Sequence, residues 1–252
     1  MTSKPLGHKC YGSIPHILGS RLGPGDHHIS VGQSRICTEE TRDKYDEVVV
    51  LEKLDGSCCG VVLLNDQLLA LNKAGYLATS SPHEQHHLFA IWVQQNEGRF
   101  RLVLNEGERI IGEWLALAHG TKYSCNTIFE PFIAFDLMKD GTRLIFDEFI
   151  ERLCCGIDYP PQRPLVTPSI LSQGPTLPEL ALSRDHNPWR LDPPEGIVYR
   201  VERKGKVDFL AKYVVPDKID GKYFETPIWN WRPKEMPLPS LKLGTMNVKP
   251  GG

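Results

Sequence analysis

The chain has 252 residues, with 29 basic and 31 acidic side chains and a net charge of −2. This length is enough for one to two domains with a sizeable core, and the charge excludes a polybasic protein but leaves room for a local basic groove. No apolar run approaches the roughly 18 residues of a membrane span, and the first residues lack the apolar stretch of a secretory signal, so we expect no membrane partner. Seven cysteines without a Cys-x-x-Cys pair predict free thiols, no zinc site and a cytoplasmic protein.

The first third of the chain predicts an irregular segment followed by strands and a helix. Residues 1–46 are rich in Gly, Pro and His and are expected to form an extended lead-in that packs on the core. Three β-rich runs with short turns, 47–54, 60–64 and 68–71, predict an antiparallel meander. A helix over 82–95 is expected, because Ser81 to Glu84 have the pattern of a capping box with proline at the first helical position.

The remainder predicts further strands, connected by Pro-rich segments. Strands are expected at 100–104, 109–117, 132–137 and 143–146, with a short helix over 147–155. Residues 159–194 are Pro-rich with one helix near 177–182, and strands 196–202 and 207–214 predict a hairpin that turns at Lys204-Gly205. The Pro-rich tail, 216–252, is expected to lie extended on the domain surface. The predicted class is α+β with a mainly antiparallel sheet.

Five short motifs carry the chemistry. Lys53 ends a buried strand just before a tight turn at Gly56, so its amine can face a cleft as a covalent nucleophile; the alternative is an exposed strand-end lysine. The other four motifs place charges or aromatic rings in apolar strands: Glu113 in Gly112-Glu113-Trp114, Phe135 and Asp136 in 132–137, Glu195 before Gly196, and Lys212 in 209–214. Taken singly, each is also compatible with an ordinary strand-end charge.

In this order, the five motifs resemble motifs I, III, IIIa, IV and V of the covalent nucleotidyltransferase superfamily of ATP-dependent ligases and mRNA capping enzymes. The resemblance extends from Lys53 to Lys212. It implies an adenylation domain over 47–215, with two mainly antiparallel sheets and flanking helices in an ATP-grasp-like arrangement. The residues that follow Lys212 are too few for an OB domain, so none is expected.

Two positions indicate the branch of the superfamily. DNA ligases and capping enzymes usually carry Arg two residues after the motif I glycine, where this chain has Cys58. RNA ligases of the phage RNA ligase 2 type have Glu before the nucleophilic lysine, as at Glu52, but commonly carry Asn at the position of Cys58. Motif IV, Glu195 to Arg200, also looks like bacterial and phage RNA ligase domains, so RNA ligase is favoured. Motif V often has a second lysine, for which Lys204 and Lys206 are candidates.

The resemblance implies an ATP-dependent ligase that works through a lysyl-AMP intermediate and requires Mg²⁺ or Mn²⁺. Lys53 would be the nucleophile, Lys212 would contact the α-phosphate, and Glu195 with Glu113 would hold the metal. The resemblance further implies that Glu113 contacts the ribose and that Phe135 contacts the adenine. Asp55 and Gly56 would form the loop that aims Lys53, and Glu52 and Lys73 would also contact the nucleotide. Burial, the metal and Lys212 are expected to lower the pKa of Lys53.

The expected partner is nucleic acid with 5′-phosphate and 3′-hydroxyl ends, with RNA favoured. A protein partner that supplies nucleic-acid binding is a further expectation for so short a chain. Two alternatives stay open: a nucleotide-binding regulatory module without turnover, and a transferase that uses DNA ends or GTP. Three other features have structural interpretations that are favoured over functional ones: His83 and His87 as a metal pair, Trp229 and Trp231 as base-stacking rings, and the vicinal Cys58-Cys59.

Overall fold

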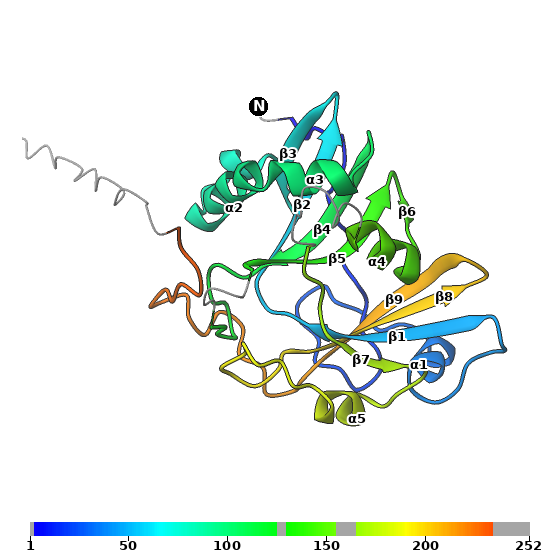
Figure 1. The fold of residues 1–252 in the computed structure, drawn as a ribbon. Helices are drawn as coiled ribbons and strands as arrows, with labels where there is room; N and C mark the ends of the chain where they lie inside the picture. Colours follow the sequence, from blue (N-terminus) through cyan, green and yellow to red (C-terminus); the bar gives the residue numbers. More distant parts are fainter. Residues whose placement is uncertain (1–2, 125–129, 155–164, 234–252) are drawn as a thin grey trace, which may run out of the picture.

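Two antiparallel sheets form the protein in the computed structural model, which describes residues 3–124, 130–154 and 165–233 (Figure 1). The first sheet has the order β7-β1-β8-β9, with bounds Ile170–Gln173, Asp46–Lys53, Gly196–Arg203 and Lys206–Val214. The second has the order β3-β2-β4-β5-β6, with bounds Gln67–Asn72, Ser57–Leu64, Glu108–Trp114, Phe132–Lys139 and Thr142–Arg143. The predicted α+β class with two mainly antiparallel sheets is confirmed.

The chain passes from one sheet to the other directly after β1. The predicted meander over 47–71 is wrong in its first strand, because β1 pairs with β8 and β7 rather than with β2. β2 and β3 do form the expected hairpin, with Asn65 and Asp66 at φ 51° and 59° in its turn. β1 is buried on both faces, as a central strand must be, so it cannot lie at the edge of a meander. The crossing at residues 54–56 brings Lys53 to the junction of the sheets.

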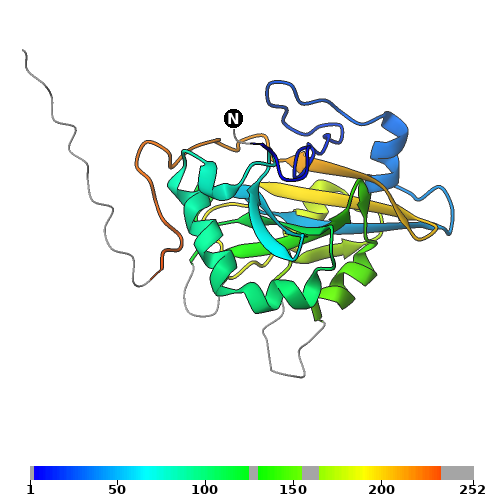
Figure 2. The ribbon, with the colours of Figure 1, turned by 90° about the horizontal axis from the view of Figure 1, so that it is seen from above.

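Three helices cover the outer face of the second sheet: α2 (Glu84–Gln95), α3 (Glu97–Val103) and α4 (Phe146–Cys154). Figure 2 shows them along one side of the paired sheets, with α1 on the opposite side. Their apolar faces bury Phe89, Phe100 and Phe149 against strand residues such as Phe132 and against Val49 of β1. This cluster joins both sheets in one core.

Several predicted bounds in this region are wrong. Residues 100–104 lie largely in α3, because Phe100 and Val103 bury at helical spacing against the second sheet. The strand expected at 143–146 is reduced to β6, since Phe146 already begins α4. The predicted helix 82–95 is confirmed as α2, but Ser81 caps no helix; its hydroxyl instead contacts the His86 ring and accepts the His83 N–H. Of the helix expected over 147–155, Cys155 lies outside the described residues.

The N-terminal segment is more ordered than an extended lead-in. It contains α1 (Val31–Thr38), which begins with a capping box formed by Ser30 and Gln33. Ile17, Ile29 and Ile36 pack with strand residues of the first sheet. The Pro-rich segment likewise contributes β7, which was not predicted, and α5 (Pro178–Ser183), which was. A short 3-10 helix, Ala78–Ser80, precedes α2.

The described part of the tail returns to the core. Trp229 forms a bridge with Leu117, and the ring of Trp231 packs edge-on against Trp114 with 5.5 Å between centroids. The Asn230 side chain donates to the carbonyl of Leu115. These contacts favour anchoring of the tail over base stacking by the two tryptophans, while 234–252 lie outside the described residues. Within the described ranges, no helix combines the length and the apolar character that a membrane crossing would need.

Candidate active site

A cavity of about 620 Å³ opens where β1 leaves the first sheet. Its walls come from both sheets, from the start of α2 and from the N-terminal segment. Apart from the motif V candidates Lys204 and Lys206, every residue that the sequence predicts for nucleotide or metal binding lines this cavity: Glu52, Lys53, Asp55, Gly56, Lys73, Glu113, Phe135, Glu195 and Lys212. Residues that are up to 160 positions apart in the chain are therefore brought to one site.

Lys53 ends β1 opposite Gly196 of β8, so the residue before Gly196 faces it directly. The Lys53 Nζ donates to Glu195 Oε2 at 2.5 Å. Burial lowers the pKa of Lys53, but the carboxylates of Glu195, Glu113 and Asp55 outweigh burial and raise it. The expected lowering of the Lys53 pKa is therefore wrong for the protein without bound ligands, because this lysine is already paired.

Gly56 lets the turn after Lys53 approach the second sheet. A Cβ atom at this position would lie 2.5 Å from the carbonyl oxygen of Trp114, so a larger residue would push the turn away. The Gly56 N–H donates to Glu113 Oε1 at 3.0 Å, and the Asp55 N–H donates to the Tyr123 hydroxyl at 3.0 Å. The turn that follows the lysine is thus fixed to the second sheet.

Glu113, Glu195 and Asp55 concentrate negative charge around Lys53. Burial raises the pKa of Glu113 to about 7; the nearby Lys53 opposes this effect and Glu195 adds to it. A divalent cation would offset this charge, and carboxylates suit Mg²⁺ and Mn²⁺. In the part of the chain that the structure describes, no three His, Cys, Asp or Glu side chains form a metal cluster. Glu113 and Glu195 therefore fit a site that water and phosphate oxygens would complete, as is usual for Mg²⁺.

Lys212 enters the cavity from β9 and is held by the N-terminal segment. Its backbone N–H donates to the Pro15 carbonyl at 2.9 Å, and its carbonyl accepts the Ile17 N–H at 3.0 Å. Asp26 Oδ1 lies 3.8 Å from Lys212 Nζ. Burial lowers the pKa of Lys212, with Asp26 opposing this effect and Lys53 adding to it. Sequence reasoning did not place Asp26 beside Lys212, because Asp26 stands in an irregular segment without periodic pattern.

Phe135 forms an aromatic wall of the cavity. Its ring packs edge-on against Tyr11, with 5.4 Å between centroids, and Val198 of β8 also lines the cavity. A half-buried ring and an aliphatic side chain in one cavity suit a flat, apolar base. Lys73 reaches the same cavity from the exposed turn after β3, and its contact to a nucleotide stays a prediction.

Glu52 borders the cavity, but its carboxylate is already bound by other residues. Both carboxylate oxygens accept from Asn187 Nδ2, and Oε1 also accepts from Arg190 at 2.8 Å. Its side chain is 2% exposed. A contact between Glu52 and a nucleotide would therefore come from the backbone.

Two sets of candidates prove to lie elsewhere or to have structural roles. Lys204 and Lys206 occupy the far turn of the β8–β9 hairpin, where Lys204 lies over the Tyr45 ring, and neither lines the cavity. They do not supply a second motif V lysine. The His87 ring donates to the Ser81 carbonyl at 2.6 Å, which favours a structural role over a metal pair with His83.

The vicinal cysteines face opposite sides of β2. Cys58 lines the cavity, whereas Cys59 is buried in the core, as strand alternation requires.

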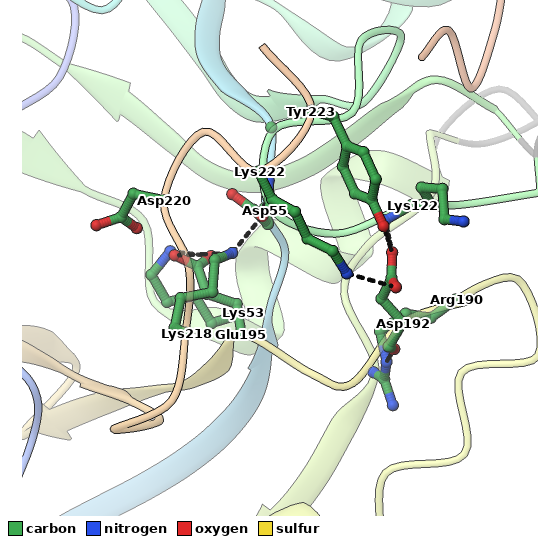
Figure 3. Close-up of polar contacts among 12 residues, drawn as sticks. Lys53, Asp55, Lys122, Arg190, Asp192, Glu195, Lys218, Asp220, Lys222 and Tyr223 are labelled. Atoms are coloured by element: carbon green, nitrogen blue, oxygen red, sulfur yellow. Dashed lines mark hydrogen bonds and ion pairs between the residues drawn. The ribbon is translucent and has the colours of Figure 1, made fainter. Parts of the chain in front are cut away.

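A lysine that sequence reasoning did not single out reaches the site from beyond β9. Lys218 Nζ forms an ion pair with Asp55 Oδ2 and lies 3.8 Å from Glu195 Oε1 (Figure 3). It stands in an irregular segment without periodic pattern, so no sequence signal pointed to it. Two lysines and three carboxylates thus meet beside the cavity.

Residues 46–214 match the family model described as RNA ligase. Because the match covers more than half of the chain, the protein belongs to the RNA ligase family, within the covalent nucleotidyltransferase superfamily. None of the curated proteins compared with the chain matches it.

Among solved structures, the chain is similar to an archaeal ATP-dependent RNA ligase, with 19% identity, a TM-score of 0.44 and coverage of 67% of this chain and 42% of that one. It is also similar to the Naegleria gruberi RNA ligase with PPi, with 18% identity, a TM-score of 0.46 and coverage of 68% and 50%. For a variant of the Naegleria gruberi RNA ligase with AMP and Mn, the identity is 15% and the TM-score 0.49, with coverage of 79% of this chain and 59% of that one. The chain thus spans about half the length of these proteins.

Proposed function

We propose that the protein is an ATP-dependent RNA ligase that forms phosphodiester bonds through lysyl-AMP and an adenylylated 5′-phosphate end. One observation carries the proposal. Lys53, in Lys-x-Asp-Gly, emerges into a cavity whose other walls present Glu113 from β4, Glu195 from just before β8, and Lys212 from β9. Membership of the RNA ligase family supports the reaction class.

The proposed reaction has three steps. In the first, the neutral Lys53 amine attacks the α-phosphorus of ATP, a P–N bond forms, and the bond to pyrophosphate breaks. In the second, an oxygen of the RNA 5′-phosphate attacks the same phosphorus, a pyrophosphate link to AMP forms, and the lysine leaves. In the third, a 3′-hydroxyl attacks the activated 5′-phosphorus, the phosphodiester forms, its proton goes to solvent, and AMP leaves.

The chain's own residues position these groups. Lys53 must give up its ion pair with Glu195 and lose a proton before it can attack, since an ammonium has no free electron pair. Lys212 is placed to stabilise charge that develops on the α-phosphate. Phe135 and Val198 provide the apolar surface for the base. A divalent cation held partly by Glu195 and Glu113 would, when bound, neutralise phosphate charge.

Intact mass measured after incubation with ATP and Mg²⁺ tests the first step. We expect an increase of one AMP on the wild type and none on Lys53→Ala. A parallel incubation with α-labelled GTP decides between the two nucleotides. A wild type that forms no adduct between pH 6 and 9 would instead favour a nucleotide-binding regulatory module, and an adduct on another residue would remove Lys53 from its role.

RNA as the substrate rests on the family and on Cys58, at the position where DNA ligases usually carry Arg. We expect 5′-phosphorylated RNA ends or RNA-containing nicks to be sealed faster than all-DNA nicks. Matched substrates must be compared at one salt concentration, because phosphate binding is salt-dependent. Faster sealing of the DNA nick would reverse the assignment. We further propose a cytoplasmic location, which the free state of the described cysteines supports, and a protein partner that helps to hold RNA.

A further inference from the structure

The segment that follows β9 sends one side chain back into the interior. The Lys218 side chain is 5% exposed, and its ammonium lies between Asp55 and Glu195. Figure 3 shows Lys53, Asp55, Glu195 and Lys218 directed toward one another. Lys218 lies outside residues 46–214, the part of the chain that matches the family model.

Other contacts hold this segment in place. Asp220 pairs with Arg21 of the N-terminal segment at 2.6 Å. Lys222 and the Tyr223 hydroxyl both donate to the Asp192 carboxylate, at 3.1 and 2.8 Å (Figure 3). The Tyr223 N–H donates to the His119 carbonyl at 3.0 Å. Before Lys218, the Val215 N–H donates to the Glu195 carbonyl at 3.0 Å, so the chain is fixed on both sides of Lys218.

The charges at this point divide into two pairs. Lys53 pairs with Glu195, and Lys218 pairs with Asp55, whose Oδ2 also accepts the Gly120 N–H at 2.7 Å. A buried carboxylate without a cation is unfavourable and attracts the nearest one. Lys53, two residues away, interacts electrostatically with Asp55, so its ammonium would become a partner for Asp55 if Lys218 were absent. Lys218 does not line the cavity, so it acts through Asp55 rather than on the nucleotide.

We propose that Lys218 is a positioning residue for adenylylation, which occupies Asp55 so that Lys53 stays directed at the cavity beside Glu195. This inference rests on the proposed ligase function. Lys218 does not replace the second lysine of motif V, because it does not line the cavity.

The test compares wild type, Lys218→Met and Lys218→Arg, with Lys204→Met, at the far turn of the β8–β9 hairpin and outside the cavity, as the control. The rate of AMP adduct formation on Lys53 is measured against ATP concentration. Misdirection of a nucleophile commonly costs about tenfold to a hundredfold in rate, so Lys218→Met should lose at least about tenfold in maximal rate. The half-saturating ATP concentration should stay unchanged, and Lys218→Arg should recover most of the rate. Lys204→Met should behave as the wild type.

The double variant with Asp55→Asn separates positioning from general damage to the structure. If Lys218 acts by occupying Asp55, Lys218→Met should cost much less in the Asp55→Asn background than in the wild type. Should Lys218→Met alone fail to fold, the double variant is compared with Asp55→Asn, because neither buries an unpaired carboxylate at residue 55. Similar rates in these two proteins support the role of Lys218, and a large further loss in the double variant overturns it.

The outcomes distinguish the two proposals. An adduct on the wild type with an unchanged rate in Lys218→Met overturns the role of Lys218 and leaves the ligase function intact. A loss as large in the Asp55→Asn background, or a raised half-saturating ATP concentration with an unchanged maximal rate, also overturns it. A wild type that forms no adduct overturns the proposed function and this inference with it.

Discussion

The carboxylate of Asp26 lies 3.8 Å from the ammonium of Lys212 and so joins the N-terminal segment to the cavity around Lys53. Asp26 is itself held by His16, whose Nε2 lies 3.0 Å from Asp26 Oδ2 and whose Nδ1 lies 2.7 Å from Ser20 Oγ. The Ser20 hydroxyl in turn accepts the Val214 N–H at the end of β9. The segment before residue 46 thus supports Lys212 through both its backbone and its side chain.

Replacement of Asp26 should weaken the positioning of Lys212. We expect Asp26→Asn to lower the rate of adenylylation by about two- to fivefold, because a partly exposed ion pair contributes about 0.2–1 kcal/mol. The free energy of unfolding should change little. Adduct formation is followed by mass, with Asp208→Asn, at the far hairpin turn beside Arg42, as the matched control. Equal rates in the two variants would show that Asp26 does not support Lys212.

Replacement of Lys212 should have a much larger effect on rate. Removing a donor that stabilises charge in the transition state commonly lowers the rate by about 10²–10³. We therefore expect Lys212→Ala to fold normally and to form the Lys53 adduct at least about a hundredfold more slowly. Lys206→Ala, in the same strand but outside the cavity, serves as the control. Near wild-type adenylylation in a folded Lys212→Ala protein would remove this residue from the site.

Replacement of Glu195 should change the response to metal as well as the rate. We expect Glu195→Ala to lose at least about a hundredfold in adenylylation, the magnitude typical of such electrostatic groups. It should also need more Mg²⁺ or Mn²⁺ for its half-maximal rate, because one of the two proposed carboxylate ligands is gone. A titration of the metal on Glu195→Ala and on Lys212→Ala separates the two roles. An identical metal response in both variants would argue against Glu195 as a ligand.

His86 should make stability depend on pH. Burial, followed by the nearby His83, His119 and His87, lowers the pKa of His86 from 6.5 to about 4. The unfolded chain therefore binds a proton at this site between pH 6.5 and 4 while the folded protein does not. The contribution is fully present above pH 6.5 and is lost as pH falls toward 4, by about 3 kcal/mol at most.

Urea unfolding at pH 7.5 and pH 4.5 checks this prediction. The wild type should lose more unfolding free energy between the two pH values than His86→Gln, in which the titrating group is absent. Comparison of the two proteins cancels the contribution of the other titrating groups. Identical losses would show that His86 does not titrate with a lowered pKa.

The residues of the cavity could be predicted from the sequence, because they belong to short motifs and the order of these motifs along the chain indicates one site. Lys53 and Gly56 need only a strand end and a tight turn, and Glu113 and Lys212 are charges in otherwise apolar strands. Such local patterns follow from the period-two alternation of strands and from the space around a glycine. For this reason every predicted nucleotide or metal residue except the motif V candidates Lys204 and Lys206 lines the cavity.

Pairing between distant segments was beyond the sequence. β1 is apolar enough to join either sheet, so packing against β8 decides its partner. Phe100 and Val103 form part of a helix because α3 buries them together. Asp26 and Lys218 lie in irregular segments without periodicity, before and after the domain. Asp26 and Lys218 can form ion pairs only because the fold brings them beside Lys212 and Asp55. An ion pair depends on proximity in space and leaves no pattern in the chain.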